Sequence, residues 1–242
     1  MARSNRYILP RQFYHITHRC HDRKFLLRFG KDRDSYRYWL REGLKRYPVS
    51  ILGYCVTSNH IHLLTYSEKS GAVSRLMQFV EGTSAQAYNR RKNRQGAFWE
   101  GRYHCTLIGT GRYLWTCLAY IDLNMVRARA VSHPDQWEWC SYREILGLRR
   151  RYRIIDRDIW LKRTGVNNLA DFQARYQTVL AVFMSEGENL RDPQWTESLA
   201  VGDHAFVESL KDQFSRQRIV ISETDSPEGK NWSIREEAQP YG

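Results

Sequence analysis

The chain has 242 residues, a formal net charge of +12 and five cysteines, and these properties exclude several classes of protein. No apolar run approaches the ~18–20 residues that span a bilayer, so we expect no membrane partner. The odd number of cysteines includes no Cys-x-x-Cys pair, which argues against a zinc ribbon and favours reduced thiols in a cytoplasmic protein. The positive charge favours a nucleic acid partner and a nucleoid-associated location.

The positive charge is concentrated in the first part of the chain. Residues 1–150 contain 26 Lys and Arg against 11 Asp and Glu, whereas residues 151–242 contain 12 against 15. Two basic runs stand out, at 90–94 and at 149–153. Such runs suit phosphate contacts that release counterions, although a solvated basic surface is the alternative interpretation of each.

The spacing of apolar residues predicts alternating strands and helices in the first part of the chain. Pro48 marks the end of the first helix, and Ser58-Asn59 marks the turn of a hairpin. The expected elements are a strand at 12–19, a helix at 32–47, strands at 49–57 and 60–66, a helix at 71–91, a strand at 104–109 and a helix that begins near Thr110.

This order predicts an α+β fold, namely a ferredoxin-like, four-stranded antiparallel sheet with helices on one face. Residues 1–150 would form that domain. Residues 151–222 predict a helical C-terminal extension, because apolar side chains recur there at helical spacing. Residues 223–242 are polar and contain two prolines, so we expect a disordered tail.

The segment 57–64 contains His60 and His62, two positions apart in an expected strand. Residues i and i+2 of a strand point to the same face, so the two imidazoles could bind a divalent metal ion through neutral ring nitrogens. A lone His-x-His is a weak signal, and ordinary core or surface histidines are the alternative.

Tyr120 and Asn124 lie four residues apart in the expected helix that begins near Thr110, so they share one face of it. A phenol and a carboxamide one turn apart supply a nucleophile and a metal ligand. The alternative is a core aromatic beside a helix-ending Asn. Tyr113 shares the same face but lies about 10 Å further along the axis, at 1.5 Å per residue.

Several separated sequence blocks resemble those of the single-tyrosine HUH transposases, where HUH means His-hydrophobic-His. The similarity runs from about Arg3 to about Tyr142 and is strongest to the REP-associated branch. Order and spacing make the set more specific than any one block. The blocks are FYHIT at 13–17, NHIHLL at 59–64, YNRR at 88–91, GAFWEGRY at 96–103, YIDLNMVRA at 120–128 and WEWCSY at 137–142.

The resemblance implies a ferredoxin-like domain, often a homodimer, that acts on single-stranded or hairpin DNA. By similarity, His60 and His62 would be metal ligands, Tyr120 the nucleophile and Asn124 the third ligand. Mn²⁺ or Mg²⁺ would be the cofactor, and mixed His and Asn ligands suit Mn²⁺ better. The residues expected to contact DNA are Arg90, Arg91, Lys92, Arg94, Trp99, Arg102 and Arg127, with the Trp99 ring available to stack on unpaired bases.

Three positions depart from the family pattern. Ser58 and Met125 stand where the family usually has Pro, and Arg129 stands where Gly is common. Ser58 leaves the turn before His60 less constrained, and Met125 removes a bias of Asn124 away from helical geometry. Arg129 removes a glycine-type helix stop. None of these departures changes a candidate chemical group.

The predicted function is therefore metal-dependent cleavage and rejoining of single-stranded DNA at hairpin-associated sites, through a covalent 5′-phosphotyrosine. Two alternatives remain open. One is a sequence-specific hairpin DNA-binding protein without catalysis. The other is a metal-dependent phosphodiesterase in which water attacks and no protein–DNA adduct forms.

Overall fold

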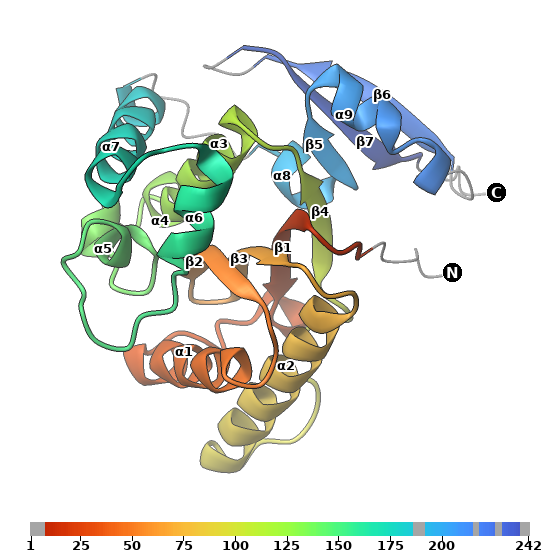
Figure 1. Cartoon of the computed structure of the whole chain (residues 1–242). Helices are drawn as coiled ribbons and strands as arrows, with labels where there is room; N and C mark the ends of the chain where they lie inside the picture. Colours follow the sequence, from red (N-terminus) through yellow and green to blue (C-terminus); the bar gives the residue numbers. More distant parts are fainter. Residues whose placement is uncertain (1–7, 186–191, 215–217, 226–228, 238–242) are drawn as a thin grey trace.

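The computed structural model describes residues 8–185, 192–214, 218–225 and 229–237. Across these residues, the strands form a single sheet with the order β2-β3-β1-β4-β5-β7-β6 (Figure 1). The strands are β1 (Gln12–Arg19), β2 (Ser50–Val56), β3 (His60–Ser67), β4 (His104–Ile108), β5 (Ala200–Gly202), β6 (Ile219–Thr224) and β7 (Asn231–Glu236).

The helices of the first part lie close to where the sequence predicts them, and further helices follow. In the described part of the chain, no helix combines the length and apolarity needed to cross a membrane. The α-helices are α1 (Gly30–Leu44), α2 (Ala72–Arg91), α3 (Arg112–Asp122), α4 (Asn124–Arg127), α5 (Tyr142–Ile145), α6 (Arg157–Thr164), α7 (Leu169–Ser185), α8 (Gln194–Glu197) and α9 (His204–Ser209). Short 3-10 turns are η1 (His21–Arg23), η2 (Pro134–Gln136) and η3 (Asp212–Phe214).

The first four strands pair antiparallel, and their register sets the face of each histidine. His62 lies opposite Thr17 of β1 and opposite Cys55 of β2. Directly opposed residues of neighbouring strands share a face of the sheet. His60 has the same parity as His62 along β3, so both imidazoles start from one face, as the sequence predicts.

Helices cover both faces of the sheet, so the expectation of helices on one face is wrong (Figure 1). On the His62 face, Leu118 of α3 comes within 2.5 Å of the position that a Cβ on Gly53 would take. On the other face, Glu81 of α2 contacts His18 of β1 at 2.7 Å. The physical reason is that α3 is largely apolar on all sides, and every residue from Tyr113 to Asp122 is buried. A helix that is apolar all round needs partners on every side.

The part after residue 150 contains strands as well as helices, so the expectation of a helical extension is wrong there. β5 pairs in parallel with β4, and β7 and β6 follow it, which extends the expected four strands to seven in the described residues. The open edge of β4 presents unpaired backbone groups, and β5 satisfies them. The α+β class itself is confirmed.

The expectation of a disordered tail at 223–242 is also wrong in part. β7 occupies 231–236 and pairs with β6 along six residues of each strand. Cross-strand pairing gives these polar residues the order that a local composition argument misses. Positions 226–228 and 238–242 lie outside the described residues.

A buried carboxylate ties the C-terminal helices to α3. Asp122 accepts hydrogen bonds from the Tyr176 hydroxyl at 2.6 Å and from the Ser141 hydroxyl at 2.7 Å. The Ser141 backbone N–H donates to the same carboxylate at 3.0 Å. Burial raises the pKa of Asp122 to about 6, and these donors oppose that rise. The network fixes the end of α3, two residues after Tyr120.

Candidate active site

A cavity of about 720 Å³ lies where α3 and α4 meet the sheet. It brings together all four residues that the sequence singled out as chemical groups, along with several cationic side chains. Its lining is Thr17, His18, Arg19, Arg23, His60, His62, Glu100, Arg102, His104, Tyr120, Asn124, Arg127, Ala128, Thr196 and Glu197. The helix that carries Tyr120 thus covers the strand face that carries the His pair.

His62 is held at both ring nitrogens. Its Nδ1 lies 2.9 Å from His15 Nε2, and its Nε2 lies 2.9 Å from Asn124 Nδ2. His15 in turn contacts the main-chain oxygen of Trp195 through Nδ1 at 2.7 Å. Burial away from water lowers the pKa of His15 to about 3 and that of His62 well below its usual value. Both imidazoles are therefore neutral at physiological pH.

His60 is oriented by the turn that precedes it. Its Nδ1 lies 2.8 Å from Asn59 Oδ1 and 2.9 Å from Thr57 Oγ1. The Thr57 hydroxyl also accepts from the backbone N–H groups of Asn59 and His60, at 3.3 and 3.0 Å. This hydroxyl turn supplies the constraint that Pro would otherwise give at Ser58. The His60 and His62 rings lie 4.9 Å apart.

Asn124 stays on the Tyr120 face although α3 ends before it. Leu123 separates α3 from α4 with φ −81° and ψ 2°, and its N–H still donates to Ala119 at 2.9 Å. The chain therefore continues almost helically, and Asn124 reaches His62. With Met125 in place of Pro, the chain at Asn124 thus follows a helical turn.

Arg129 ends α4 in the left-handed region, with φ 55°. Its N–H donates to the Val126 carbonyl at 2.8 Å, and the Ala130 N–H donates to the Met125 carbonyl at 3.0 Å. These two bonds form a Schellman stop, which glycine usually provides. The stop expected to be missing is therefore present, at the cost of a strained non-glycine residue.

Arg127 lies against Tyr120. Its guanidinium carbon is 3.9 Å from the centre of the Tyr120 ring, and Nη2 donates to the Tyr120 main-chain oxygen at 2.7 Å. The Tyr120 side chain is 8% exposed and is surrounded by the rings of His15, His62 and Trp195. Arg127 thus lies directly against the candidate nucleophile, a position that the sequence pattern, which predicts only a DNA contact, does not show.

The expected DNA contacts at the end of α2 divide into two groups. Arg91 forms an ion pair with Asp32, and Arg94 donates to Asn89 Oδ1 at 2.9 Å and to the Ala97 carbonyl at 2.7 Å. Both therefore hold the local structure together. Arg90 and Lys92 have exposed side chains at the same helix end.

The interpretation of Trp99 as a base-stacking side chain is wrong. Its ring is buried, stacks on His18 at 4.5 Å between centroids and donates from Nε1 to the Glu81 carbonyl at 3.2 Å. The exposed phenyl rings are those of Phe25 and Phe29, at 65% and 57%. No periodicity in the sequence separates these two rings from core residues.

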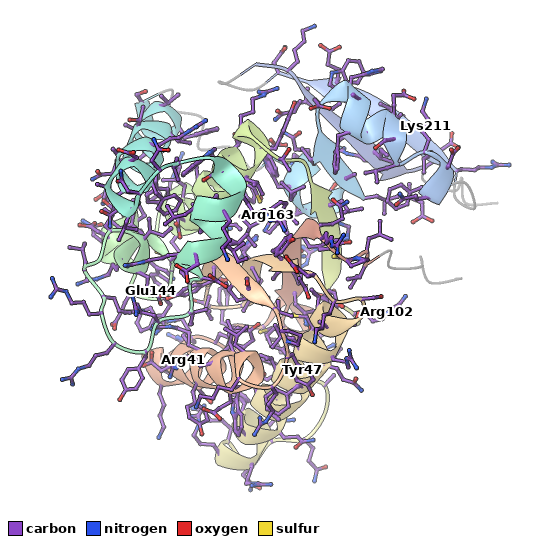
Figure 2. All side chains as sticks on the ribbon, viewed as in Figure 1. Arg41, Tyr47, Arg102, Glu144, Arg163 and Lys211 are labelled. Atoms are coloured by element: carbon purple, nitrogen blue, oxygen red, sulfur yellow. The ribbon has the colours of Figure 1, made fainter. Side chains whose placement is uncertain are left out.

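The basic run at 149–153 lies away from the candidate site. Arg149 donates to the main-chain and side-chain oxygens of Glu138 at 2.9 and 3.1 Å. The run follows the segment of Glu144, which lies on the opposite side of the molecule from Arg102 (Figure 2). Arg102 lines the 720 Å³ cavity, and none of the residues 149–153 does.

Sequence reasoning assigned no role to His15 and did not consider Trp195. His15 lies on the same strand face as Thr17, but only the pairing of β1 with β3 shows that it meets His62. No local signal marks the carbonyl of Trp195. Among described residues, no group of three His, Cys, Asp or Glu side chains is arranged to hold a metal ion. The candidate ligand set is instead two His and one Asn.

One protein family and several solved structures are similar to this chain. The sequence model of the family described as "Transposase IS200 like" matches residues 10–124. A REP-associated tyrosine transposase solved with a REP hairpin superposes with a TM-score of 0.53 at 17% identity, covering 64% of this chain and 93% of that one. A crystal structure assigned as a transposase from Deinococcus radiodurans R1 gives 0.34 at 15% identity, covering 45% and 87%. The comparison with curated protein sequences gave no match.

Proposed function

We propose that this chain cuts and rejoins single-stranded DNA, because its residues 10–124 match the sequence model of the IS200-like transposase family. The nucleophile would be Tyr120, and the target sites would lie beside DNA hairpins. The observation that carries the proposal is the shared cavity, in which Tyr120 lies beside His60, His62 and Asn124.

The candidate ligands fit a divalent metal ion. Two ligands bound at right angles to one ion at about 2.1 Å each lie about 3 Å apart. His62 Nε2 and the Asn124 amide are separated by 2.9 Å. Half a turn of that amide exchanges Nδ2 for Oδ1 with almost no change in shape. His60, His62 and Asn124 would hold Mn²⁺ or Mg²⁺, and the two imidazoles favour Mn²⁺.

When bound, the ion would polarise the scissile phosphate and stabilise the charge that develops on it. The Tyr120 oxygen would lose its proton and form a bond to phosphorus while the bond to the 3′-oxygen breaks. That oxygen takes up a proton and leaves as a 3′-hydroxyl, with the 5′-phosphate on Tyr120. Arg127 over the ring stabilises the phenolate through its positive charge. A 3′-hydroxyl can reverse the step, so rejoining needs no ATP.

The surface around the cavity supports a DNA strand as the substrate. Arg19, Arg23 and Arg102 line the cavity and would contact phosphates of the bound strand. Beyond Arg23, the exposed Phe25 and Phe29 rings offer stacking surfaces for unpaired bases. Lys92 Nζ lies 5.1 Å from the Phe29 ring, so Lys92 could contact a phosphate next to a base that stacks on Phe29.

The test is incubation of the protein with labelled hairpin oligonucleotides that carry single-stranded flanks, with and without Mn²⁺. We expect a denaturant-resistant protein–DNA adduct in wild type that is abolished by EDTA and by Tyr120→Phe. Hairpin binding by Tyr120→Phe should stay within a few-fold of wild type, because only one hydroxyl is removed.

Tyr113→Phe and Tyr103→Phe are matched controls, since neither ring lines the cavity. The Tyr113 hydroxyl accepts from Arg112 at 3.0 Å, and the Tyr103 hydroxyl donates to Ser74 at 3.5 Å. An adduct lost in Tyr113→Phe and retained in Tyr120→Phe would move the nucleophile. Cleavage without an adduct would favour attack by water, and binding without cleavage would favour the non-catalytic alternative. The expected homodimer stays a prediction that the mass in solution would test.

A further inference from the structure

We propose that the C-terminal segment fixes the tautomer of His62 through His15, so that His62 presents an unprotonated Nε2 to Asn124 and the cavity. His15 is then a positioning residue, which acts through His62. The observation is a continuous chain of contacts from the Trp195 carbonyl to His15, His62 and Asn124, with distances of 2.7, 2.9 and 2.9 Å.

The chain has only one proton arrangement when the rings are neutral. A carbonyl oxygen only accepts, so His15 Nδ1 must carry the hydrogen that meets Trp195. The neutral ring then has an unprotonated Nε2, which can only accept. The facing Nδ1 of His62 must therefore donate, and the Nε2 of His62 is left with its lone pair. In the structure, that lone pair accepts from the Asn124 amide.

The surroundings of His15 favour the neutral ring. Its side chain is completely buried, and its ring nitrogens contact a carbonyl and another imidazole. The nearby Arg127 already places one positive charge beside it. A second buried cation, which no carboxylate of the described residues contacts, would be costly.

The same orientation is imposed on His60 by local groups. Asn59 Nδ2 donates to the Arg23 carbonyl at 3.2 Å, which leaves Asn59 Oδ1 facing His60 Nδ1. The Thr57 hydroxyl gives its hydrogen to the His60 carbonyl at 2.8 Å, so it cannot donate to that ring. Both histidines therefore carry their hydrogen on Nδ1. The turn achieves this for His60, and a segment more than 130 residues away in sequence achieves it for His62.

The Trp195 carbonyl is itself held in place. Thr106 of β4 donates to it at 3.3 Å and to the Ser198 carbonyl at 2.8 Å. His104 Nε2 also contacts the Ser198 carbonyl, at 3.0 Å. Ligands whose second nitrogen is fixed in this way typically lose 10–100-fold in metal affinity when the fixing partner is removed.

The direct test is the tautomer of His62 in the metal-free, DNA-free protein. Long-range ¹H–¹⁵N correlation spectra of ¹⁵N-histidine protein at neutral pH distinguish protonated from unprotonated ring nitrogens. His62→Gln, which loses one set of signals, assigns the resonance. We expect Nδ1–H and an unprotonated Nε2 for His62, the form that free histidine populates less. An Nε2–H tautomer would overturn the inference.

Two variants at one position separate the two halves of the contact. His15→Gln places an amide oxygen near the former Nε2, so it can still accept from His62. His15→Asn can still donate to Trp195 but is too short to reach His62. We expect Mn²⁺ affinity, measured by EPR titration, to fall about 10–100-fold in His15→Asn and within about 3-fold in His15→Gln. Equal affinities in the two variants would overturn the role of His15.

The metal arm of this inference rests on the proposed function, and the tautomer arm does not. If Mn²⁺ fails to bind wild type, the proposed function loses its cofactor while the spectrum still decides the tautomer. If His62 proves to be the Nε2–H form while wild type forms the DNA adduct, the tautomer inference fails and the proposed function stands. If His15→Asn does not fold, the wild-type spectrum alone decides.

Discussion

Two regions of the chain meet at the cavity, and they contribute in different ways. Residues 10–124 provide the candidate chemical groups and the strands and helix that carry them. Residues 192–202 provide the Trp195 ring against Tyr120, the carbonyl that His15 contacts, and the strand that extends the sheet beyond β4. The family match ends at residue 124, but the structure of the site does not. A domain boundary drawn from charge and motifs thus separated parts that fold as one sheet.

The largest effect that separates these two roles is expected from Trp195→Ala. The side chain is buried and lies 6.1 Å from the Tyr120 ring, so its loss should cost about 3–5 kcal/mol of unfolding free energy. It should also weaken Mn²⁺ binding, because the segment loses its packing against the site. Phe172→Ala is the matched control, since Phe172 is equally buried but packs against Trp115 and Trp160 instead of Tyr120. Chemical denaturation should show similar losses of unfolding free energy in the two variants. EPR titration should show a lower Mn²⁺ affinity in Trp195→Ala alone. An unchanged Mn²⁺ affinity in both variants would show that the C-terminal segment stabilises the fold without influencing the metal site.

Arg127→Gln tests the chemistry of the first region. Removing a charge that stabilises the phenolate should slow adduct formation about 10²–10³-fold under single-turnover conditions. Arg112→Gln gives a close comparison, because Arg112 lies over Tyr113 of the same helix at 4.6 Å. That variant should react at the wild-type rate. If both variants bind the hairpin weakly and react normally once saturated, Arg127 is only a DNA contact.

Phe25→Ala and Phe29→Ala test where the unpaired bases lie. Each stacked base contributes about 1–3 kcal/mol of binding free energy, so each variant should weaken binding of a flanked hairpin about 5–150-fold. A hairpin without flanks should bind as in wild type. Tyr152→Ala removes an exposed ring of the run at 149–153, which lies beside Arg41 and away from the candidate site, and should change neither affinity. Equal losses for flanked and unflanked hairpins would refute stacking on the flank.

The charge difference between residues 1–150 and 151–242 predicts a difference in salt dependence. With about five phosphate contacts to single-stranded DNA, the slope of log affinity against log salt should be roughly −3 to −4. Replacing both Arg90 and Lys92 with Gln should make it shallower by about 1.4, at about 0.7 per contact. Lys162→Gln combined with Lys211→Gln should leave the slope unchanged. Binding titrations from low to moderate salt give this slope for wild type and the two double variants. Identical slopes would show that Arg90 and Lys92 do not contact DNA phosphates.

The smallest expected effect is at the end of α4. Arg129→Gly relieves a left-handed residue and should stabilise the protein by about 0.5–1 kcal/mol, after the entropy cost of glycine. The melting temperature should rise by about 1–4 °C for a chain of this size. Gly101→Ala, at φ 64° with open space around it, should move the melting temperature the other way. A lower melting temperature in Arg129→Gly would show that the Arg side chain makes a contribution of its own.

Sequence patterns predicted the parts of this molecule in which local spacing determines direction. The two-residue spacing of His60 and His62 and the four-residue spacing of Tyr120 and Asn124 fix their faces once strand and helix are known. Spacing could not show that α3 covers the opposite face from α1 and α2, because burial on all sides of a helix appears only when its neighbours are known. The class of fold followed from the order of elements, and the placement of its layers did not.

Other features depended on contacts between distant residues. β5 has only the small residues 200–202 and no alternation, so it becomes a strand by pairing with β4. Counting charges grouped Arg91 and Arg94 with Arg90, although Asp32 and local carbonyls engage the first two. Trp99 has the composition of a stacking side chain and the position of a core residue. In each case the sequence shows the type of residue, but a local pattern cannot show which other residues it contacts in the fold.

The contact between Trp195 and His15 has a consequence for how this site can vary. Every amino acid carries the same backbone carbonyl, so the contact itself places no requirement on the identity of residue 195. What it requires is the position of α8, which carries the Trp195 carbonyl and which an inserted or deleted residue before β5 would displace. Homologous proteins could therefore differ at every side chain of this segment and still orient the same imidazole. Conservation of loop length there would be the trace of the contact.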